Sequence, residues 1–430
     1  MKKNLLLVLI LTTLGYACTK KEDVKPNTPP SAFTITSKQT NTDLLLTWTK
    51  AQDPEGDLVT YTIVYKDTLA KNLSDTSYVI KNVPYSSTIA GSIIAKDAKG
   101  ASTSVPFSVT TYENENSYVL IPDINFEKAL IELKIDDVQD GKLLRSNAEK
   151  VKELELNGGA WFGRNETIYS IKNLQGIESF INLEKLHCDS TQLMTLDVSK
   201  NVNLTVLGCS GNQLTSLDVS KNVNLTSLSC SPNQLTSLDI SKNTSLTSLD
   251  CSRNQLTSLD VSKNVNLIEL WCYNTQLTSL DISKNTSLTS LDCSFNRLTS
   301  LDVSKNVNLT LLRCFSNQLT NLDVSKNVNL ISLECYTNQL TSLDVSKNVN
   351  LIELDCFNNQ LKSLDVSKNV NLAVLSCDNT QLTSLNVSKN TNLLALSCTN
   401  NPLQTICVNS LTQPKTNWQK DATASYKVCN

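Results

Sequence analysis

Residues 225–243 read LTSLSCSPNQLTSLDISKN, and this stretch returns along the chain every 21 residues. Its most regular marker is a cysteine. Eleven copies of one supersecondary unit at such a period indicate a solenoid, in which each coil is buried only by its neighbours. The repeat therefore decides the architecture of residues 151–408. Its cysteines are Cys188, Cys209, Cys230, Cys251, Cys272, Cys293, Cys314, Cys335, Cys356, Cys377 and Cys398.

One coil contains a short strand followed by a turn. We expect Leu228 and Cys230 to point inward and the serines beside them to point outward along the concave face. Asn233 ends the strand, and its side-chain amide is placed to bond backbone groups of adjacent coils as an asparagine ladder. Threonine interrupts this ladder at Thr191, Thr275 and Thr380. Twenty-one residues leave no room for a full helix on the convex side.

The spacing L-x-x-L-x-C-x-x-N-x-L resembles the leucine-rich repeat motif, with cysteine at the last apolar strand position. The short coils resemble those of internalins. The resemblance covers residues 151–408. It implies a solenoid with a parallel β concave face and extended or 3₁₀ segments behind it.

Residues 238–243, LDISKN, offer a second register for the concave strand. That register would stack Asp239 and its equivalents at about 4.8 Å, where in-register like charges destabilise a sheet. On a turn, the same aspartate accepts hydrogen bonds from the following backbone N–H groups. We therefore predict the cysteine register. In it the cysteines are small buried apolar residues, because sulfurs stacked in one line do not converge on a metal or adopt disulfide geometry.

Residues 1–17 combine a basic start, an apolar run too short to span a bilayer, and small residues before Cys18. They resemble the signal peptide and lipobox of bacterial lipoproteins, in which the processed cysteine is lipidated. Gly15 departs from that pattern, which usually has leucine there. The alternative is an ordinary cleaved signal. Residues 19–23, TKKED, resemble the surface-export tag of Bacteroidetes lipoproteins. The resemblance implies a lipid anchor at Cys18, a tether over residues 18–30, and a surface-exposed protein of the bacterial outer membrane.

Residues 31–112 contain short β-type runs between turn-rich segments, which predicts a small all-β sandwich. Trp48 and the strand-like residues 61–65 resemble the core of an immunoglobulin-like fibronectin type III domain. Ile89 stands where that family often has a corner tyrosine. The resemblance implies a spacer. We expect strands at residues 32–36, 44–48, 59–65, 78–80, 89–95 and 106–109.

Residues 113–150 and 409–430 flank the repeats and are expected to cap the solenoid. Phe126, Ala129, Leu130 and Leu133 share one face of a helix, which Asp123 or Asn125 starts. Two cysteines outside the ladder, Cys407 and Cys429, flank the C-terminal cap. In an exported chain they are expected to form a disulfide. The alternative makes Cys407 a displaced ladder member and leaves Cys429 free.

Composition argues against several classes of function. The net charge of −3 and an aromatic content of 5% do not indicate nucleic-acid binding. His187 is the single histidine, and we find no Ser/His/Asp set, paired carboxylates, phosphate loop or metal-ligand cluster. The acidic segment 53–57 is explained by turn chemistry, and segment 136–141 does not fit an EF-hand calcium loop, because Val138 occupies a required oxygen-ligand position. We expect a protein that is not an enzyme and takes no cofactor or metal.

Differences between coils gather on either side of each cysteine. Aromatic residues appear there only in the central coils, with charged residues interleaved among them. Exposed aromatics among a few charges are typical of binding surfaces. Cross-strand stabilisation of the sheet is the alternative explanation. The expected ligand-binding residues are Trp271, Tyr273, Phe295, Arg313, Phe315, Glu334, Tyr336, Asp355 and Phe357.

These observations predict a monomeric, surface-anchored binding lipoprotein whose concave face recognises a macromolecule, with a protein as the favoured ligand. Adhesion is what the resemblance to internalins implies. A glycan ligand and a purely structural spacer are the alternatives. The membrane is reached only through the N-terminal lipid.

Overall fold

The computed structural model describes residues 25–429 apart from residue 41 and segments 113–116 and 158–169. The expected signal peptide, Cys18 and the TKKED segment lie outside the described residues. The chain forms two compact units, Met1–Glu115 and Asn116–Asn430. No helix in the described part of the chain is long and apolar enough to cross a membrane.

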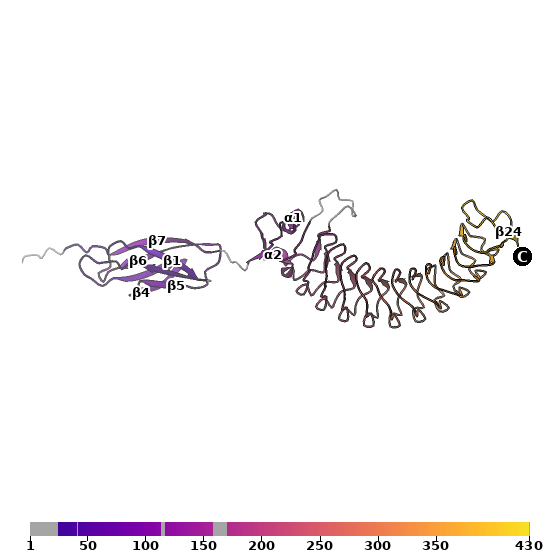
Figure 1. The fold of residues 1–430 in the computed structure, drawn as a ribbon. Coiled ribbons are helices and arrows are strands. Elements are labelled where there is room, and N and C mark those ends of the chain that lie inside the picture. Colours follow the sequence, from indigo (N-terminus) through magenta and orange to yellow (C-terminus); the bar gives the residue numbers. More distant parts are fainter. Residues whose placement is uncertain (1–24, 41, 113–116, 158–169, 430) are drawn as a thin grey trace, which may run out of the picture. The chain divides into compact units, whose positions relative to one another are not determined.

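The described part of the first unit consists of two small antiparallel sheets that share one core (Figure 1). One sheet has the order β1-β2-β5 and the other β4-β3-β6-β7. The strands are β1 Ile35–Thr40, β2 Asp43–Trp48, β3 Thr60–Tyr65, β4 Asp67–Leu73, β5 Ser77–Ile80, β6 Thr88–Lys96 and β7 Ser102–Thr110.

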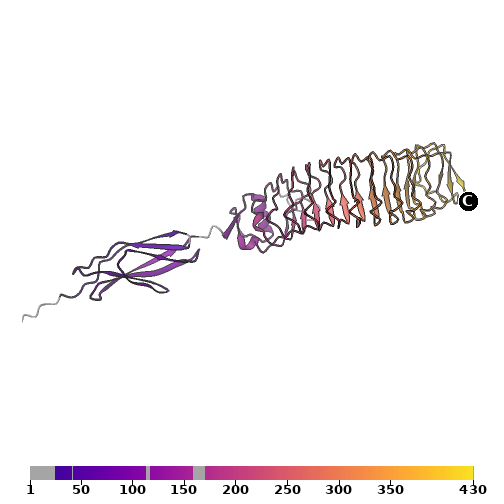
Figure 2. The same ribbon diagram turned by 90° about the horizontal axis from the view of Figure 1, so that it is seen from below.

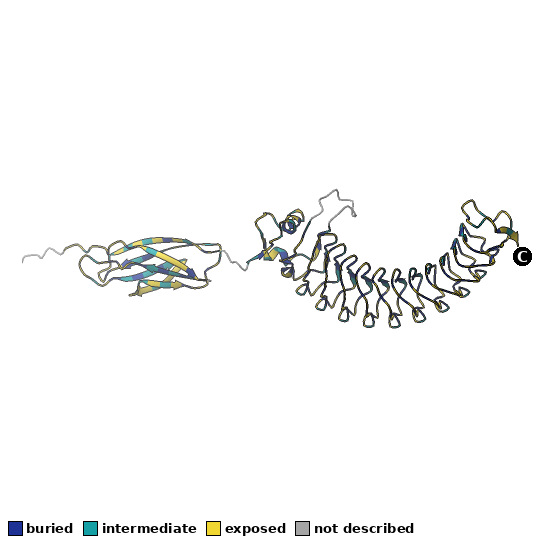
Figure 3. Cartoon of the chain, in the orientation of Figure 1, coloured by how far each residue is buried: buried dark blue, intermediate teal, exposed yellow. Residues whose placement is uncertain are grey.

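Trp48 and Tyr61 join the two sheets of this unit. Their ring centroids are 5.4 Å apart in an edge-to-face arrangement, and the Tyr61 hydroxyl accepts a 2.8 Å hydrogen bond from the Ala51 amide. Both rings are buried, whereas the outer faces of the strands are exposed (Figure 3). Strand β4 was not expected from the sequence. Its residues, DTLAKNL, are mostly exposed and lack the alternation that marks a half-buried strand.

The second unit begins with a cap built around α1, Ile124–Glu132. Asp123 is its N-cap: Oδ1 accepts from the amides of Asn125 and Phe126 at 2.9 and 3.1 Å. Its Oδ2 accepts from Lys172 and Asn173 at 2.8 and 3.0 Å, which ties the helix start to the first coils. The helix buries its apolar stripe over these coils. The other cap elements are β8 Tyr118–Leu120, β9 Lys142–Leu144 and α2 Arg145–Ala148, and the 3₁₀ turn η3 Ile177–Ser179 follows.

Within the described residues, twelve short strands form one parallel sheet; from the second strand onward each pairs in register with the strand 21 residues on. Figure 2 shows the strands as a row of parallel arrows, and Figure 1 shows the unit curving with this sheet on its concave side. The strands are β10 Glu153–Glu155, β11 Lys185–His187, β12 Val206–Gly208, β13 Ser227–Ser229, β14 Ser248–Asp250, β15 Glu269–Trp271, β16 Ser290–Asp292, β17 Leu311–Arg313, β18 Ser332–Glu334, β19 Glu353–Asp355, β20 Val374–Ser376 and β22 Ala395–Ser397.

The structure confirms the cysteine register. Leu228 and Cys230 are buried, and Ser227 and Ser229 are half-buried on the outer side of the strand. All eleven ladder cysteines, which lie in the described residues, are buried free thiols. The competing segment forms a turn instead. There the Asp218 side chain accepts a 2.9 Å hydrogen bond from the Ser220 amide.

The asparagine ladder also forms. Asn233 donates through Nδ2 to the carbonyls of Cys209 and Cys230 at 3.0 and 2.9 Å, and its Oδ1 accepts from the Leu214 amide at 2.9 Å. Each asparagine therefore satisfies backbone groups of its own coil and of the coil before it. At Thr275 the hydroxyl keeps the bond within the coil, to the Cys272 carbonyl at 2.9 Å, and bonds Asn296 Oδ1 of the next coil at 2.8 Å, but it makes no bond to the coil before it.

A second asparagine ladder runs through the convex side from Asn201 to Asn390 and was not expected from the sequence. Asn222 is typical: its Nδ2 donates to the carbonyls of Val198 and Asn201 at 3.0 and 2.8 Å. The members are fully buried. The near-uniform Lys-Asn pairs are thus a structural feature of the coil.

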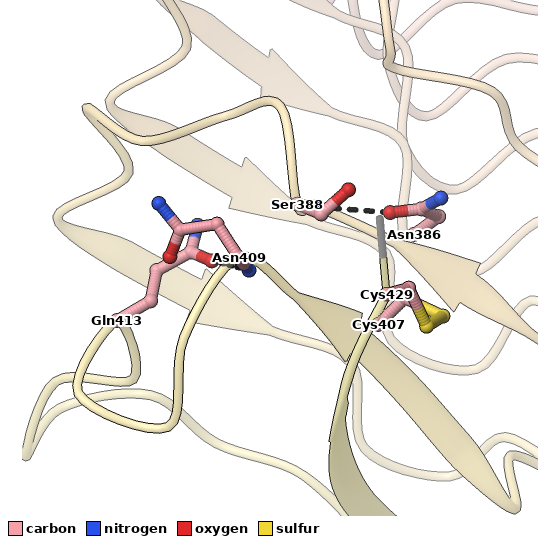
Figure 4. Close-up of a disulfide and its surroundings, with 6 residues drawn as sticks. All are labelled: Asn386, Ser388, Cys407, Asn409, Gln413 and Cys429. Carbon is pink, nitrogen blue, oxygen red and sulfur yellow. Dashed lines mark hydrogen bonds between the residues drawn. A yellow bond between two sulfur atoms is a disulfide. The ribbon is translucent and has the colours of Figure 1, made fainter.

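The C-terminal cap imitates a further coil. Gln413 donates through Nε2 to the carbonyls of Val387 and Asn390 at 3.0 and 3.1 Å, which are the two bonds that a ladder asparagine would make. Its Oε1 accepts from the Asn409 amide at 2.7 Å (Figure 4). Cys407 and Cys429 form a disulfide beside it, with Cα atoms 5.3 Å apart. The cap strands are β21 Leu385–Asn386, β23 Thr405–Val408 and β24 Ser425–Val428.

Candidate functional site

Two columns of side chains point outward from the sheet beside the buried cysteines. The before-cysteine column consists of the last residue of each strand, and the after-cysteine column consists of the residue following each cysteine. Because parallel strands in register lie about 4.8 Å apart, equivalent side chains in neighbouring coils come into contact. The residues that differ from coil to coil therefore lie next to one another on a single continuous surface.

Four rings from successive coils form a continuous row, called here the aromatic row: Phe295, Phe315, Tyr336 and Phe357. Phe315 stacks on Tyr336 with ring centroids 4.2 Å apart and planes 12° apart. Tyr336 stacks on Phe357 at 4.2 Å and 10°. At the other end of the row Phe295 packs edge-to-face on Phe315, with ring centroids 5.2 Å apart. The three stacked rings belong to the after-cysteine column and remain partly exposed.

Phe295 reaches the row from an unusual backbone position. It lies one residue beyond the after-cysteine column, has φ of 51° and is 55% exposed. Gly211, Asn274 and Asn358 occupy the same turn position in other coils, as the left-handed region favours. A bulky residue there costs about 1–2 kcal/mol. Fold stability alone does not account for a solvent-exposed phenylalanine at such a position.

Charged residues of the before-cysteine column run beside the row. Asp292, Arg313, Glu334 and Asp355 pair in register on neighbouring strands. Arg313 Nε and Glu334 Oε1 form a 2.6 Å ion pair, in which the Glu334 side chain is only 14% exposed. The hydrogen bond to Glu334 raises the pKa of Arg313, so this guanidinium stays charged.

Asp355 lies at the acidic end of this column. Burial raises its pKa, and the carboxylates of Glu353, Glu334 and Asp378 raise it further. Its Oδ1 is buried without a hydrogen-bond partner among the described residues. Burial and the same acidic neighbourhood raise the pKa of Tyr336, so its phenol stays protonated at neutral pH. This part of the face is therefore negatively charged and only partly solvated.

The structure divides the residues expected from the sequence into two groups. Seven of them, Phe295, Arg313, Phe315, Glu334, Tyr336, Asp355 and Phe357, lie in or beside the aromatic row. Tyr273 instead lies 5.5 Å below the guanidinium of Arg253, and neither it nor Trp271 pairs with a ring of the row. Ser294 separates Tyr273 from Phe315 in the after-cysteine column.

Arg253 and Asp378 were missed by the sequence reasoning. Arg253 occupies the same left-handed turn position as Phe295, with φ of 50°. A large side chain at a position that holds a small or turn-forming residue in most other coils was the signal that could have identified it. Asp378 continues the after-cysteine column beyond Phe357.

In the described residues no group of three or more His, Cys, Asp or Glu side chains is arranged to hold a metal ion. Burial raises the pKa of the Cys335 thiol to about 12, which keeps it protonated and unreactive at neutral pH. His187 lies at the N-terminal end of the sheet, 3.6 Å from Glu155.

Comparison with known proteins identifies the repeat. A family described as "Leucine Rich repeats (2 copies)" matches residues 265–306. The functional domain of InlJ from Listeria monocytogenes, described as including a cysteine ladder, is 35% identical, with a TM-score of 0.64 and 72% of each chain covered. No curated protein sequence matches this chain significantly.

Two further solved structures share the fold at lower identity. The internalin InlF of Listeria monocytogenes is 19% identical, with a TM-score of 0.53, 71% of this chain and 95% of that chain covered. The ectodomain of the Arabidopsis thaliana receptor kinase GASSHO1/SCHENGEN3, solved in complex with CASPARIAN STRIP INTEGRITY FACTOR 2, is 22% identical, with a TM-score of 0.55, 66% of this chain and 40% of that chain covered.

Leucine-rich repeat folds of this kind typically serve protein–protein interaction. The 21-residue coils, the cysteine ladder and the 35% identity over 72% of the InlJ domain agree with one another. The chain belongs to the leucine-rich repeat family, with internalin-like repeats.

Proposed function

We propose that the concave face binds a protein ligand through the aromatic row and its flanking charges. The observation that carries this proposal is the row itself, four partly exposed rings on four successive coils. Serine occupies the after-cysteine column at Ser231, Ser252 and Ser294, so the scaffold folds without rings there. Aromatic side chains with a partly desolvated charge pair are typical centres of protein interfaces.

Stabilisation of the sheet explains the row less well. Cross-strand ring pairs do stabilise neighbouring strands. Phe295, however, has a left-handed backbone, which lowers stability, and its exposed side chain offsets little of that cost by burial. Its placement is better explained by contact with a ligand.

The ring geometry favours a protein over a glycan. Sugar rings stack on the open face of an aromatic side chain. Phe315 and Phe357 cover both faces of Tyr336 at 4.2 Å, so its ring presents an edge. Phe315 has one face on Tyr336 and meets Phe295 edge-to-face, so among the three stacked rings only Phe357 keeps a face that no other ring covers. A protein segment can instead pack along the edges of such a row.

We extend the proposal to the setting of this face on a bacterial cell. The signal-like residues 1–17, Cys18 and the TKKED segment support a surface-exposed lipoprotein of the outer membrane. The two sheets of the first unit and the Trp48–Tyr61 contact support a fibronectin type III-like spacer. The protein would then act as a monomeric adhesin, anchored only by lipid. Replacing Cys18 with serine should release it from membranes, and continued membrane association would refute the anchor.

Binding of the chain to arrays of cell-surface proteins and of glycans tests the ligand class. The parent chain should bind one or a few proteins, and the Tyr336→Ser/Phe357→Ser variant should lose them. Both substitutions copy the serines of other coils, so the fold is preserved. Protein binding that the double variant retains, or binding confined to glycans, would overturn the proposal.

A further inference from the structure

We infer that the partner segment lying on the aromatic row is basic, and that an Arg or Lys side chain of the partner lies over the outer face of Phe357, between Asp355 and Asp378. The inference rests on the function proposed above and adds the chemistry of the partner. It follows from how the row ends and from the balance of charge around it.

Phe357 is the last ring of the row. Tyr336 covers one of its faces, and the next coil has Asp378 at the equivalent position. A carboxylate is much smaller than a ring. Asp378 is also held by the coil beyond it, because its Oδ1 accepts from the Ser397 hydroxyl and from the amide and hydroxyl of Thr399, each at 2.7 Å. The outer face of Phe357 is therefore followed by the Asp378 carboxylate, which hydrogen bonds hold toward the next coil and away from the ring.

The face around the row has an excess of carboxylates. From the coil of Asp292 to that of Asp378, the two columns contain four acids and one base. The base, Arg313, is already paired with Glu334. Glu353 adds a further carboxylate on the strand of Asp355. The four acids of the two columns are Asp292, Glu334, Asp355 and Asp378.

One oxygen of Asp355 lacks a hydrogen-bond donor, although the Ser376 side chain bonds the carboxyl group. Its Oδ1 is buried without a hydrogen bond among the described residues, although Glu334 and Asp378 raise the negative potential around it. Leaving a buried acceptor unpaired is unfavourable, and an incoming N–H donor removes the penalty. An acidic partner would increase the repulsion, an apolar partner would leave the oxygen unpaired, and a neutral donor would pair it without reducing the negative potential.

A guanidinium or ammonium group suits both features at once. Cations bind over aromatic faces, and they are attracted to carboxylates. Arginine fits better than lysine, because its planar group stacks on a ring while its N–H groups reach carboxylates on either side. A guanidinium already lies over a ring elsewhere in the described part of the solenoid, where Arg253 is 5.5 Å from the ring centroid of Tyr273.

A random dodecapeptide library displayed on phage and selected on the full chain tests the inference. Peptides whose binding is lost on the Phe357→Ser variant should contain Arg and Lys at about three times their frequency in the unselected library. Changing the key Arg of a selected peptide to Gln should weaken its binding roughly tenfold. The Glu353→Ser/Asp355→Ser variant should weaken the parent peptide to a similar extent.

The chain offers matched residues for this experiment. Ser332 and Ser376 occupy the positions of Glu353 and Asp355 in neighbouring coils, so the double variant keeps the coil sequence compatible with the fold. The control is Asp302→Asn/Asp323→Asn, which removes the same charge from the convex turns. In one coil an asparagine, Asn386, already replaces this turn aspartate, and its side chain accepts a 3.0 Å hydrogen bond from the Ser388 amide. This control should leave peptide binding unchanged.

Two results would overturn the inference, and they are distinguishable. Peptides that require Phe357 but show no basic enrichment, or that bind the Glu353→Ser/Asp355→Ser variant as well as the parent, would refute the basic partner and leave the protein-binding proposal standing. A selection that yields no peptide sensitive to Phe357→Ser or to Tyr336→Ser would refute both.

Discussion

Tyr336 stacks on Phe357 with ring centroids 4.2 Å apart and planes only 10° apart, although 21 residues separate them in the chain. The contact requires neighbouring coils in strict register, which the cysteine and asparagine ladders provide. The ring pair is thus a product of the scaffold. Its partial exposure makes it available to a ligand as well.

The rings of the row should stabilise one another in proportion to their contacts. Tyr336 has two stacked neighbours and Phe357 has one. At about 0.5–1.5 kcal/mol per ring pair, Tyr336→Ser should lower the free energy of unfolding by about 1–3 kcal/mol, twice the loss from Phe357→Ser. Urea denaturation measures both. Equal losses would show that the rings pack mainly on the sheet.

Alkaline pH should destabilise the solenoid through its buried thiols. Burial raises the pKa of Cys335 to about 12 from an ordinary value of 9.0, and the other ladder thiols shift in the same direction. Between pH 9 and 12 the unfolded chain releases protons that the folded chain retains. Stability is therefore unaffected by the thiols below pH 9 and falls above it, by up to about 1.4 kcal/mol per pH unit for each thiol.

Denaturation midpoints at pH 8, 9 and 10 under reducing conditions check this dependence. In the Cys314→Ala variant the free energy of unfolding should fall less steeply with pH, because one buried thiol is missing. A midpoint that stays constant from pH 8 to pH 10 would contradict the burial of the ladder.

Reduction of the Cys407–Cys429 disulfide should loosen the C-terminal cap while the coils remain folded. The bond closes a loop of 22 residues, which is expected to stabilise the cap by about 3 kcal/mol. Hydrogen exchange in β24 should accelerate about a hundredfold with dithiothreitol, whereas exchange in β13 should not change. The ladder cysteines are already free thiols, so dithiothreitol leaves them unaltered. Equal protection of β24 in both redox states would contradict this prediction.

Gln413 should be the most important polar side chain of that cap. Gln413→Ala removes two buried hydrogen bonds, to the carbonyls of Val387 and Asn390, which keep only their backbone donors, and should cost about 1–3 kcal/mol. Thermal unfolding monitored by circular dichroism measures the loss. The exposed Gln234 is a matched control, and Gln234→Ala should change stability by less than about 0.5 kcal/mol. Similar effects of the two substitutions would mean that Gln413 does not act as a ladder member.

Much of the solenoid could be predicted because its repeat is compared with itself eleven times. The inward Leu228 and Cys230, the ladder role of Asn233 and the turn at Asp218 all follow from spacing and from the repulsion of stacked charges. The helix after Asp123 follows from its apolar stripe and cap. These features are either local or strictly periodic, and both kinds of pattern can be recognised in a single sequence.

The remaining features depend on contacts that a single sequence does not show. The residues of β4 form a strand because β3 provides a neighbour, and not through an apolar pattern of their own. Gln413 makes the bonds that the next asparagine of the convex ladder would make, but its backbone lies outside the repeat and its longer side chain covers the difference. The separation of Trp271 and Tyr273 from the aromatic row depends on ring orientation and on the small Ser294 between them.

The most direct test of the account is the affinity of the parent chain and of Tyr336→Ser/Phe357→Ser for the protein that the array identifies, measured by isothermal titration. Removing two central rings should weaken binding by at least about thirtyfold, or ~2 kcal/mol. Thr320→Ser, an exposed change outside the two columns, should leave the affinity unchanged. Equal affinities of the parent and the double variant would contradict the claim that the aromatic row is the binding site.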